Sequence, residues 1–220
     1  MSASVGQQTL TSDMSDANAV AFQIKQGLAR MATAMPVKVL SVTNSGGVTP
    51  VGYVDVQPLV NQVDGAGNSV KHGTVHGLPY SRLQGGSNAV ILDPSVGDIG
   101  VIVAASRDIS AVKNTKAAAN PGSFRRHDFA DGMYVGAVLN GTPTQYVAFS
   151  GGGVSIYSPT AITLAVGGVS LEITSSGFTL AGGPVMSAQT GTFAGVIVDM
   201  HLHTGVTTGT DETGPPVAGT

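Results

Sequence analysis

The sequence predicts a mainly β protein that begins with a short helix, continues as a small barrel and ends as a trimeric, intertwined β-helix. Two patterns lead to this prediction. Short β-prone runs alternate with turn residues through the middle of the chain, and pairs of glycines then recur at a fixed spacing. Apolar residues make up 42% of the 220 residues, yet no run approaches the roughly 18 residues of a membrane helix. The apolar residues are therefore distributed over many short segments, as in thin β layers.

Composition argues against several classes of protein. The formal net charge of −3 gives no basic footprint for nucleic acid. The chain has no cysteine, so its fold does not depend on disulfides or on the redox compartment. The first 20 residues lack the basic and apolar regions of a secretory signal. We therefore expect synthesis and folding in a cytoplasm.

Residues 1–35 are expected to form a polar segment followed by a helix. Within SDANAVAFQIKQGLARMATAM, apolar residues recur at steps of three and four, which is helical periodicity. Ser15 or Asp13 can cap this helix. We expect its apolar face to pack on its own domain or on a sister chain. This face consists of Ala17, Val20, Ala21, Ile24 and Leu28.

Residues 36–148 are expected to form a barrel domain. Five or six β-prone runs are separated by Gly, Asn, Asp and Pro, which is typical of small barrels and sandwiches. In the run VGYVDVQPLV, residue types alternate, so one face of this strand is predicted to be buried. The size fits a five-stranded OB-type barrel. Residues 110–131 are expected to be a long loop that carries much of the positive charge of the domain.

Residues 149–198 are expected to form a β-helix shaft. Glycine pairs fall at 152–153, 167–168 and 182–183, a spacing of 15 residues both times. Between them, apolar residues alternate with Ser, Thr, Ala or Glu, which is the period of a strand with one buried face. A fixed period indicates a solenoid or an array.

A thin ribbon of this kind needs partners, because alone it leaves open edges and a wet apolar face. Copies wrapped around a symmetry axis would cover the face and pair the edges. Two copies would leave little interior, and four would open a hole. The sequence therefore predicts a homotrimer.

Residues 199–220 are expected to form a metal-binding tip, with His201 and His203 as ligands. Residues i and i+2 of a strand point to the same face, about 6.6 Å apart. Three chains would supply six imidazole nitrogens in two rings. Six nitrogens suit an ion that accepts octahedral coordination, such as Fe, Co or Ni, and leave no open position for a reactive water. Solvated surface histidines are the alternative interpretation of this pair.

The other histidines lack such a context. His72 and His76 are four residues apart in a strand-like region, which is too far for one ion. We expect surface or loop positions for both and for His127. Asp211 and Glu212 are expected to be solvated charges.

Several segments resemble one family. LPYSRLQGGSNAVILDPSVGDIGVIVAASRDIS (78–110) and FRRHDFADGMYVGAVLN (124–140) are similar to the N-terminal domain of the membrane-puncturing central spike of contractile-tailed bacteriophages. HLHTG resembles the tip motif of the same family. The resemblance covers most of residues 36–205. One departure is that no bulky aromatic residue occurs in AVKNTKAAAN, shortly after RDIS.

The resemblance implies an OB-fold collar, a trimeric β-helix and one iron ion per trimer, bound at the tip by His201 and His203 of three chains. It also implies a structural protein without catalytic residues. Such a spike sits at the virion's tail baseplate tip, and it pierces the host outer membrane by mechanical contact when the sheath contracts. Its expected partners are copies of itself, the baseplate hub and the tail tube proteins.

Other functions stay open at this point. An envelope-degrading spike enzyme, a depolymerase or a lysozyme-like hydrolase, would need two carboxylates about 5–10 Å apart. Residues 151–198 hold one acidic residue, Glu172, although Asp199, Asp211 and Glu212 could cluster across chains. A cellular OB-fold module for nucleic acid would need basic and aromatic faces. A spike of a tail-derived bacterial injection machine would use the same architecture.

Overall fold

The chain is mainly β. The computed structural model describes residues 11–12, 14–182, 192–193 and 196–197. The chain divides into two compact units, residues 1–142 and 143–220. No helix in the described part of the chain is long and apolar enough to cross a membrane.

The predicted N-terminal helix is confirmed as α1 (Asp16–Ala29), and Ser15 is its cap. The Ser15 hydroxyl accepts a hydrogen bond from the backbone N–H of Asn18 at 3.2 Å, which satisfies one of the free donors of the first turn. No residue of α1 is buried. Its apolar face is therefore not covered by the part of the chain that the structure describes.

The helix ends earlier than the apolar periodicity indicates, because the first strand, β1 (Ala34–Val42), already begins at Ala34. The N–H of Ala32 donates to the carbonyl of His127 at 2.9 Å, and the carbonyl of Thr33 accepts from Ala104 at 2.8 Å. Pro36 in addition disfavours a helical conformation at the residue before it. Contacts with the sheet thus replace the last helical turn.

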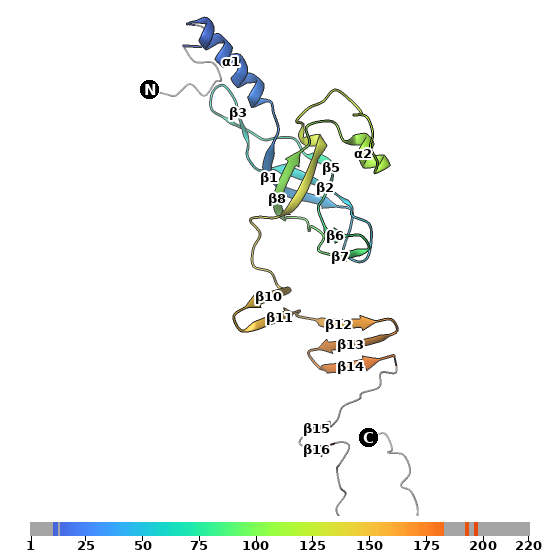
Figure 1. Cartoon of the computed structure of the whole chain (residues 1–220). Coiled ribbons are helices and arrows are strands. Elements are labelled where there is room, and N and C mark those ends of the chain that lie inside the picture. Colours follow the sequence, from blue (N-terminus) through green and yellow to red (C-terminus); the bar gives the residue numbers. More distant parts are fainter. Residues whose placement is uncertain (1–10, 13, 183–191, 194–195, 198–220) are drawn as a thin grey trace, which may run out of the picture. The chain divides into compact units, whose positions relative to one another are not determined.

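An antiparallel five-stranded sheet forms the first unit. It curls into a half-barrel (Figure 1). A parallel bridge joins Tyr80 to Tyr134, and the N–H of Ser81 donates to the carbonyl of Tyr134 at 2.8 Å, so the two edge strands meet at one end. The spatial order of the strands is β5 (Val75–Pro79), β2 (Tyr53–Pro58), β1, β8 (Ile99–Ala104) and β9 (Gly132–Ala137).

Two short hairpins extend from this sheet. The first pairs β3 (Gln62–Val63) with β4 (Ser69–Val70). The second pairs β6 (Leu83–Gly85) with β7 (Asn88–Val90), and it lies between β5 and β8 in the sequence.

The concave face of the sheet holds the hydrophobic core. The predicted alternation in β2 is confirmed, because Val54 and Val56 are buried while their neighbours are partly exposed. Gly100 lets the ring of Tyr134 lie against β8, since a Cβ there would approach two ring carbons at 2.5 Å. The buried core consists of Val37, Val39, Val54, Val56, Leu78, Tyr80, Ile102 and Tyr134.

The prediction that residues 110–131 form one long loop is wrong in part. This segment contains α2 (Ser110–Thr115) and a short 3-10 helix, η1 (Phe129–Asp131). The start of α2 is held by carboxylates, because Ser110 N–H donates to Asp108 at 2.8 Å and Ile109 N–H donates to Asp131 at 3.2 Å. Asp131 lies 22 residues further along the chain, so no local pattern reveals this contact.

The second unit is a series of antiparallel hairpins. β10 (Tyr146–Ser150) pairs with β11 (Gly153–Tyr157). β12 (Ala161–Val166), β13 (Val169–Thr174) and β14 (Gly177–Ala181) form a three-stranded meander, in which they lie side by side (Figure 1). Further along, β15 (Thr192–Phe193) pairs with β16 (Val196–Ile197).

The glycine pairs occupy defined places in these hairpins. Gly167 and Gly168 are the two turn residues between the paired Val166 and Val169, and Gly167 has a φ of 57°. Two-residue hairpin turns favour glycine, because they need a positive φ. Gly182 lies so close to the carbonyl of Gly168 that a side chain there would overlap it. The 15-residue spacing thus brings successive glycine pairs together across the meander.

Replacing Ile102 with alanine tests the core of the first unit. Ile102 has no exposed surface, so we expect Ile102→Ala to lower the free energy of unfolding by about 2–5 kcal/mol. Urea unfolding followed by tyrosine fluorescence measures this change, since Tyr80 and Tyr134 lie in the same core. The neighbouring Val103 is 39% exposed, and Val103→Ala is the matched control with a smaller effect. Equal losses for both variants would contradict the assigned core.

Candidate functional site

The metal ligands predicted from the sequence, His201 and His203, lie outside the described residues, as do Asp199, Asp211 and Glu212. Within the described ranges, no group of three or more His, Cys, Asp or Glu side chains could hold a metal ion. The structure therefore places no alternative metal centre in the parts of the chain that it describes.

The three other histidines have separate surroundings. His76 is exposed, and its Nδ1 lies 3.1 Å from a carboxylate oxygen of Asp55. The ring of His72 makes an edge contact with Phe129, with ring centroids 6.5 Å apart. His127 takes a positive φ of 49° in the loop before η1. These positions agree with the surface and loop roles that the sequence predicts.

The strands of the second unit create a continuous apolar surface. In the register of β12, β13 and β14, Ile162 pairs with Ile173 and Leu164 pairs with Leu171. Side chains that are directly opposite in an antiparallel pair share a face, so these rows and their neighbours lie on one side of the sheet. We call this side the apolar face. It consists of Ile162, Leu164, Val166, Val169, Leu171, Ile173, Phe178 and Leu180.

None of the described residues covers the apolar face. No described residue between positions 143 and 182 is buried. Val166 is 84% exposed and Phe178 is 60% exposed. Alternation puts only small or polar side chains on the opposite face, including Thr163, Ala165 and Glu172. The sheet therefore has one side suited to water and one side that is not.

The β10–β11 hairpin repeats this division. Val147 pairs with Ile156 and Phe149 pairs with Val154, so four large apolar side chains share one side. Phe149 is 80% exposed. An isolated two-stranded hairpin is at best marginally stable in water. The β10–β11 hairpin and the β12–β14 meander therefore both need a partner surface.

An ionic cluster with two buried carboxylates organises the loops of the first unit. The guanidinium of Arg125 donates to both carboxylate oxygens of Asp131 and to Asp108, each at 3.1 Å. The Ser123 hydroxyl donates to Asp108 at 2.6 Å. Both carboxylates are almost fully buried. The segments RDIS (107–110) and FRRHDFAD (124–131) thus meet in one set of ion pairs.

Hydrogen bonding sets the charge state of this cluster. Hydrogen bonds from Ser110 and Ser123 lower the pKa of Asp108 well below its usual range, and the charge of Arg125 adds to this effect. No local pattern in the sequence pairs Asp108 with Asp131. The sequence signal for this cluster was the presence of charged residues near apolar strands. That signal does not identify which residues pair, because the partners are distant in sequence.

A second ion pair, between Arg82 and Asp93, is buried in the first unit. Arg82 and Asp93 are 3% and 4% exposed, and Arg82 also donates to the carbonyl of Thr49 at 2.6 Å. The Tyr80 hydroxyl donates to Asp93 at 2.7 Å. Burial raises the pKa of Asp93, but the hydrogen bonds from Arg82 and Tyr80 outweigh it, so the net pKa is lowered.

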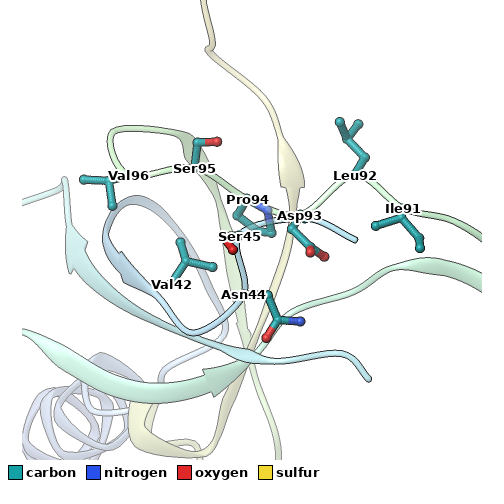
Figure 2. A pocket seen from close by; sticks show the side chains of 10 residues that line it. Val42, Asn44, Ser45, Ile91, Leu92, Asp93, Pro94, Ser95 and Val96 are labelled. Atoms are coloured by element: carbon teal, nitrogen blue, oxygen red, sulfur yellow. The ribbon is translucent and has the colours of Figure 1, made fainter. Parts of the chain in front are cut away.

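Asp93 also lines a cavity of about 530 Å³ between the loop after β1 and the loop before β8 (Figure 2). Asn44 and Ser45 come from the first of these loops, and Pro94 and Ser95 come from the second. One oxygen of Asp93 has no hydrogen-bond partner among the described residues. Arg82 neutralises this carboxylate. Because Arg82 also donates to Thr49 in the first loop and Asp93 lies in the second, the ion pair links the two loops.

In comparisons with known proteins, no protein-family model matches the chain and no curated protein matches it. The function is therefore argued from the residues of the chain.

Acid unfolding tests the ionic cluster. The pKa of Asp108 is lower in the folded chain than the value near 3.9 of an unfolded one, so the unfolded state binds more protons between these values. Its contribution to stability is present above about pH 4 and is lost as the pH falls. We expect Asp108→Asn to have a lower melting temperature than the wild type at pH 7, and the difference should shrink towards pH 3. The exposed Glu172→Gln variant is the control, and a difference that stays constant with pH would contradict the role of Asp108.

Proposed function

We propose that the chain is one subunit of a homotrimeric, structural spike that punctures a host outer membrane at the centre of a contractile phage tail baseplate. The observation that carries the proposal is the uncovered apolar face of the β12–β14 meander, repeated on the β10–β11 hairpin. A shaft made of several copies would bury this face in its interior.

The energetics favour association of the second unit. Full burial of a Val, Leu, Ile or Phe side chain contributes about 1.5–3 kcal/mol. The eight residues of the apolar face are only partly exposed at present, so covering them contributes on the order of 10 kcal/mol per chain before the cost of association. Closed rings of identical chains are the ordinary way to cover such a face.

The first unit supports an OB-type collar. Numbered by their order in the chain, the five strands of its sheet are arranged 3-2-1-4-5, and a parallel bridge links the third to the fifth near Tyr80 and Tyr134. A partly open five-stranded barrel is the form that OB-folds take. In the proposed spike this collar would attach to the baseplate hub and the tail tube.

The exposed side of α1 supports the same association. Heptad spacing, with steps of four, three and four residues, relates Ala17, Ala21, Ile24 and Leu28. In this pattern Leu28 is at core position a and Ile24 is at core position d. Leucine and isoleucine in these positions favour trimers or tetramers over dimers. Three copies held together by their shafts would bring three such helices into reach of one another.

The tip completes the proposal. Six imidazoles from His201 and His203 of three chains form a donor set that suits iron, and the ion supplies no chemistry beyond holding its ligands together. Metal binding stabilises only the assembled state, so it would act as a clasp where the chains would otherwise fray. A shaft tied in this way resists bending and fraying when a contracting sheath drives it into a membrane.

A charge on the apolar face tests the trimer. Leu164 lies on the edge strand β12, in the middle cross-strand row of this face, opposite Leu171. We expect Leu164→Asp to abolish trimerisation, because three carboxylates would be buried without partners. Light scattering coupled to size exclusion should give three times the 22.0 kDa chain mass for the wild type and a lower mass for the variant.

Ala165→Asp is the matched control, since Ala165 is adjacent and lies on the opposite face. It should leave the trimer intact. A monomeric wild type, or two variants that behave alike, would defeat the proposal.

Metal analysis tests the tip. Purified protein should hold one metal ion per three chains, and changing both His201 and His203 to alanine should remove it. The trimer should survive on its shaft, because the clasp acts only at the end. One ion per chain, or no metal after expression with ample iron, would contradict the proposed site.

A further inference from the structure

A second cavity, of about 560 Å³, lies wholly within the first unit. The turn before β2 supplies one wall with Val51, and α2 supplies another with Val112. Met133 at the start of β9 also lines it. These three side chains are partly exposed, so the cavity offers apolar surface to a ligand.

Two lysines give this cavity its charge. Lys113 and Lys116 are among its lining residues, and no lining residue is acidic. The ion pairs among the described residues include neither lysine. Lys113 instead donates to the carbonyl of Gly77 at 3.4 Å, a long hydrogen bond to a neutral group. The positive charge of the cavity is therefore not neutralised within the described part of the chain.

This charge belongs to a basic segment in an otherwise acidic protein. Five of the ten Lys and Arg residues fall between positions 107 and 126, although the chain has a net charge of −3. The single acidic residue in this segment is Asp108, which is buried against Arg125. The surface around α2 therefore attracts negative charge.

The ionic cluster holds this surface in place. Ile109 and Ser110, which begin α2, donate their N–H groups to Asp131 and Asp108. At the other end of α2, the N–H of Lys116 donates to the carbonyl of Val112 at 2.8 Å. Lys113 lies in this short helix and Lys116 is its C-cap, so both are held in place before any ligand binds, which reduces the entropic cost of binding.

We propose that this cavity binds an acidic protein segment, with one apolar side chain in the cavity and carboxylates beside Lys113 and Lys116. Lining of this kind, apolar with a few charged groups, is typical of ligand sites, and a volume of several hundred Å³ exceeds that of one side chain. The ligand therefore also occupies the cavity with its backbone. Single-stranded nucleic acid is disfavoured, because it needs stacked aromatic side chains and Tyr53 is the only aromatic lining residue. The proposal does not depend on the trimer or on the metal.

Peptide binding tests this proposal on the full chain. The probes are fluorescein-labelled nine-residue peptides with Leu or Phe at the centre and Glu at the flanking positions, with measurement of fluorescence anisotropy. We expect the dissociation constant to rise at least tenfold for Lys113→Glu combined with Lys116→Glu. Binding should also weaken with added salt, because exposed charges are screened.

The matched control is Lys25→Glu combined with Lys71→Glu, which makes the same change in charge at exposed lysines outside the cavity. It should bind within twofold of the wild type. Peptides with Lys in place of Glu should bind the reversed variant better than the wild type. Val112→Ser changes the apolar wall without changing charge, and it should weaken binding of the Glu peptides.

Three results would overturn the proposal. The first is no binding of the Glu peptides to the wild type at millimolar concentration. The second is equal binding by the cavity variant and the control variant when both melt at the wild-type temperature. The third is tighter binding of an oligothymidylate of similar length, which would assign the surface to nucleic acid. Each result leaves the measured mass of the assembly unaffected, so failure here and failure of the trimer are distinguishable.

Discussion

A sheet with one apolar face is unstable in water unless another surface covers that face, and the second unit has no such surface among its described residues. Its hairpins between positions 146 and 181 have two-residue turns, so none of these turns is long enough to fold back over the sheet. The opposite face carries small and polar side chains such as Thr163 and Ala165, which need no cover. The two faces of the sheet therefore differ in polarity within a single chain, and the apolar face is the one that a partner would cover.

The first unit meets the same requirement by itself. Its sheet curls until Tyr80 and Tyr134 meet, which leaves a core with fully buried Val, Leu and Ile side chains. Apolar loop residues such as Val48, Leu92 and Phe124 are exposed, and ion pairs with buried carboxylates hold the loops instead. Leaving one charge of such a pair unpartnered is costly, so each pair strongly specifies the position of its loop. Arg125 thereby fixes α2, and with α2 it fixes the lysines of the cavity.

The parts of the fold that could be predicted from the sequence are those that depend on near neighbours. The alternation in β2, the strands of the second unit and the cap at Ser15 each follow from a few adjacent residues. The end of α1 and the existence of α2 could not be predicted in the same way. Both depend on hydrogen bonds to distant residues, as between Ile109 and Asp131, and α2 alone is too short to be stable. The metal ligands His201 and His203 remain a prediction from spacing and resemblance.

The turns also determine which partner the apolar face can accept. A slip of one residue in register would move every apolar side chain to the opposite face. Gly167, with its positive φ in a two-residue turn, prevents such a slip between β12 and β13. Between positions 143 and 182 the only charged residue is Glu172, so charge cannot select a partner for this face. Selection of a partner then depends on complementarity of shape. An identical chain has the same register, so it presents the same rows of apolar side chains at the same spacing. The cavity beside Lys113 and Lys116 differs in this respect, because its charge can select an unlike partner.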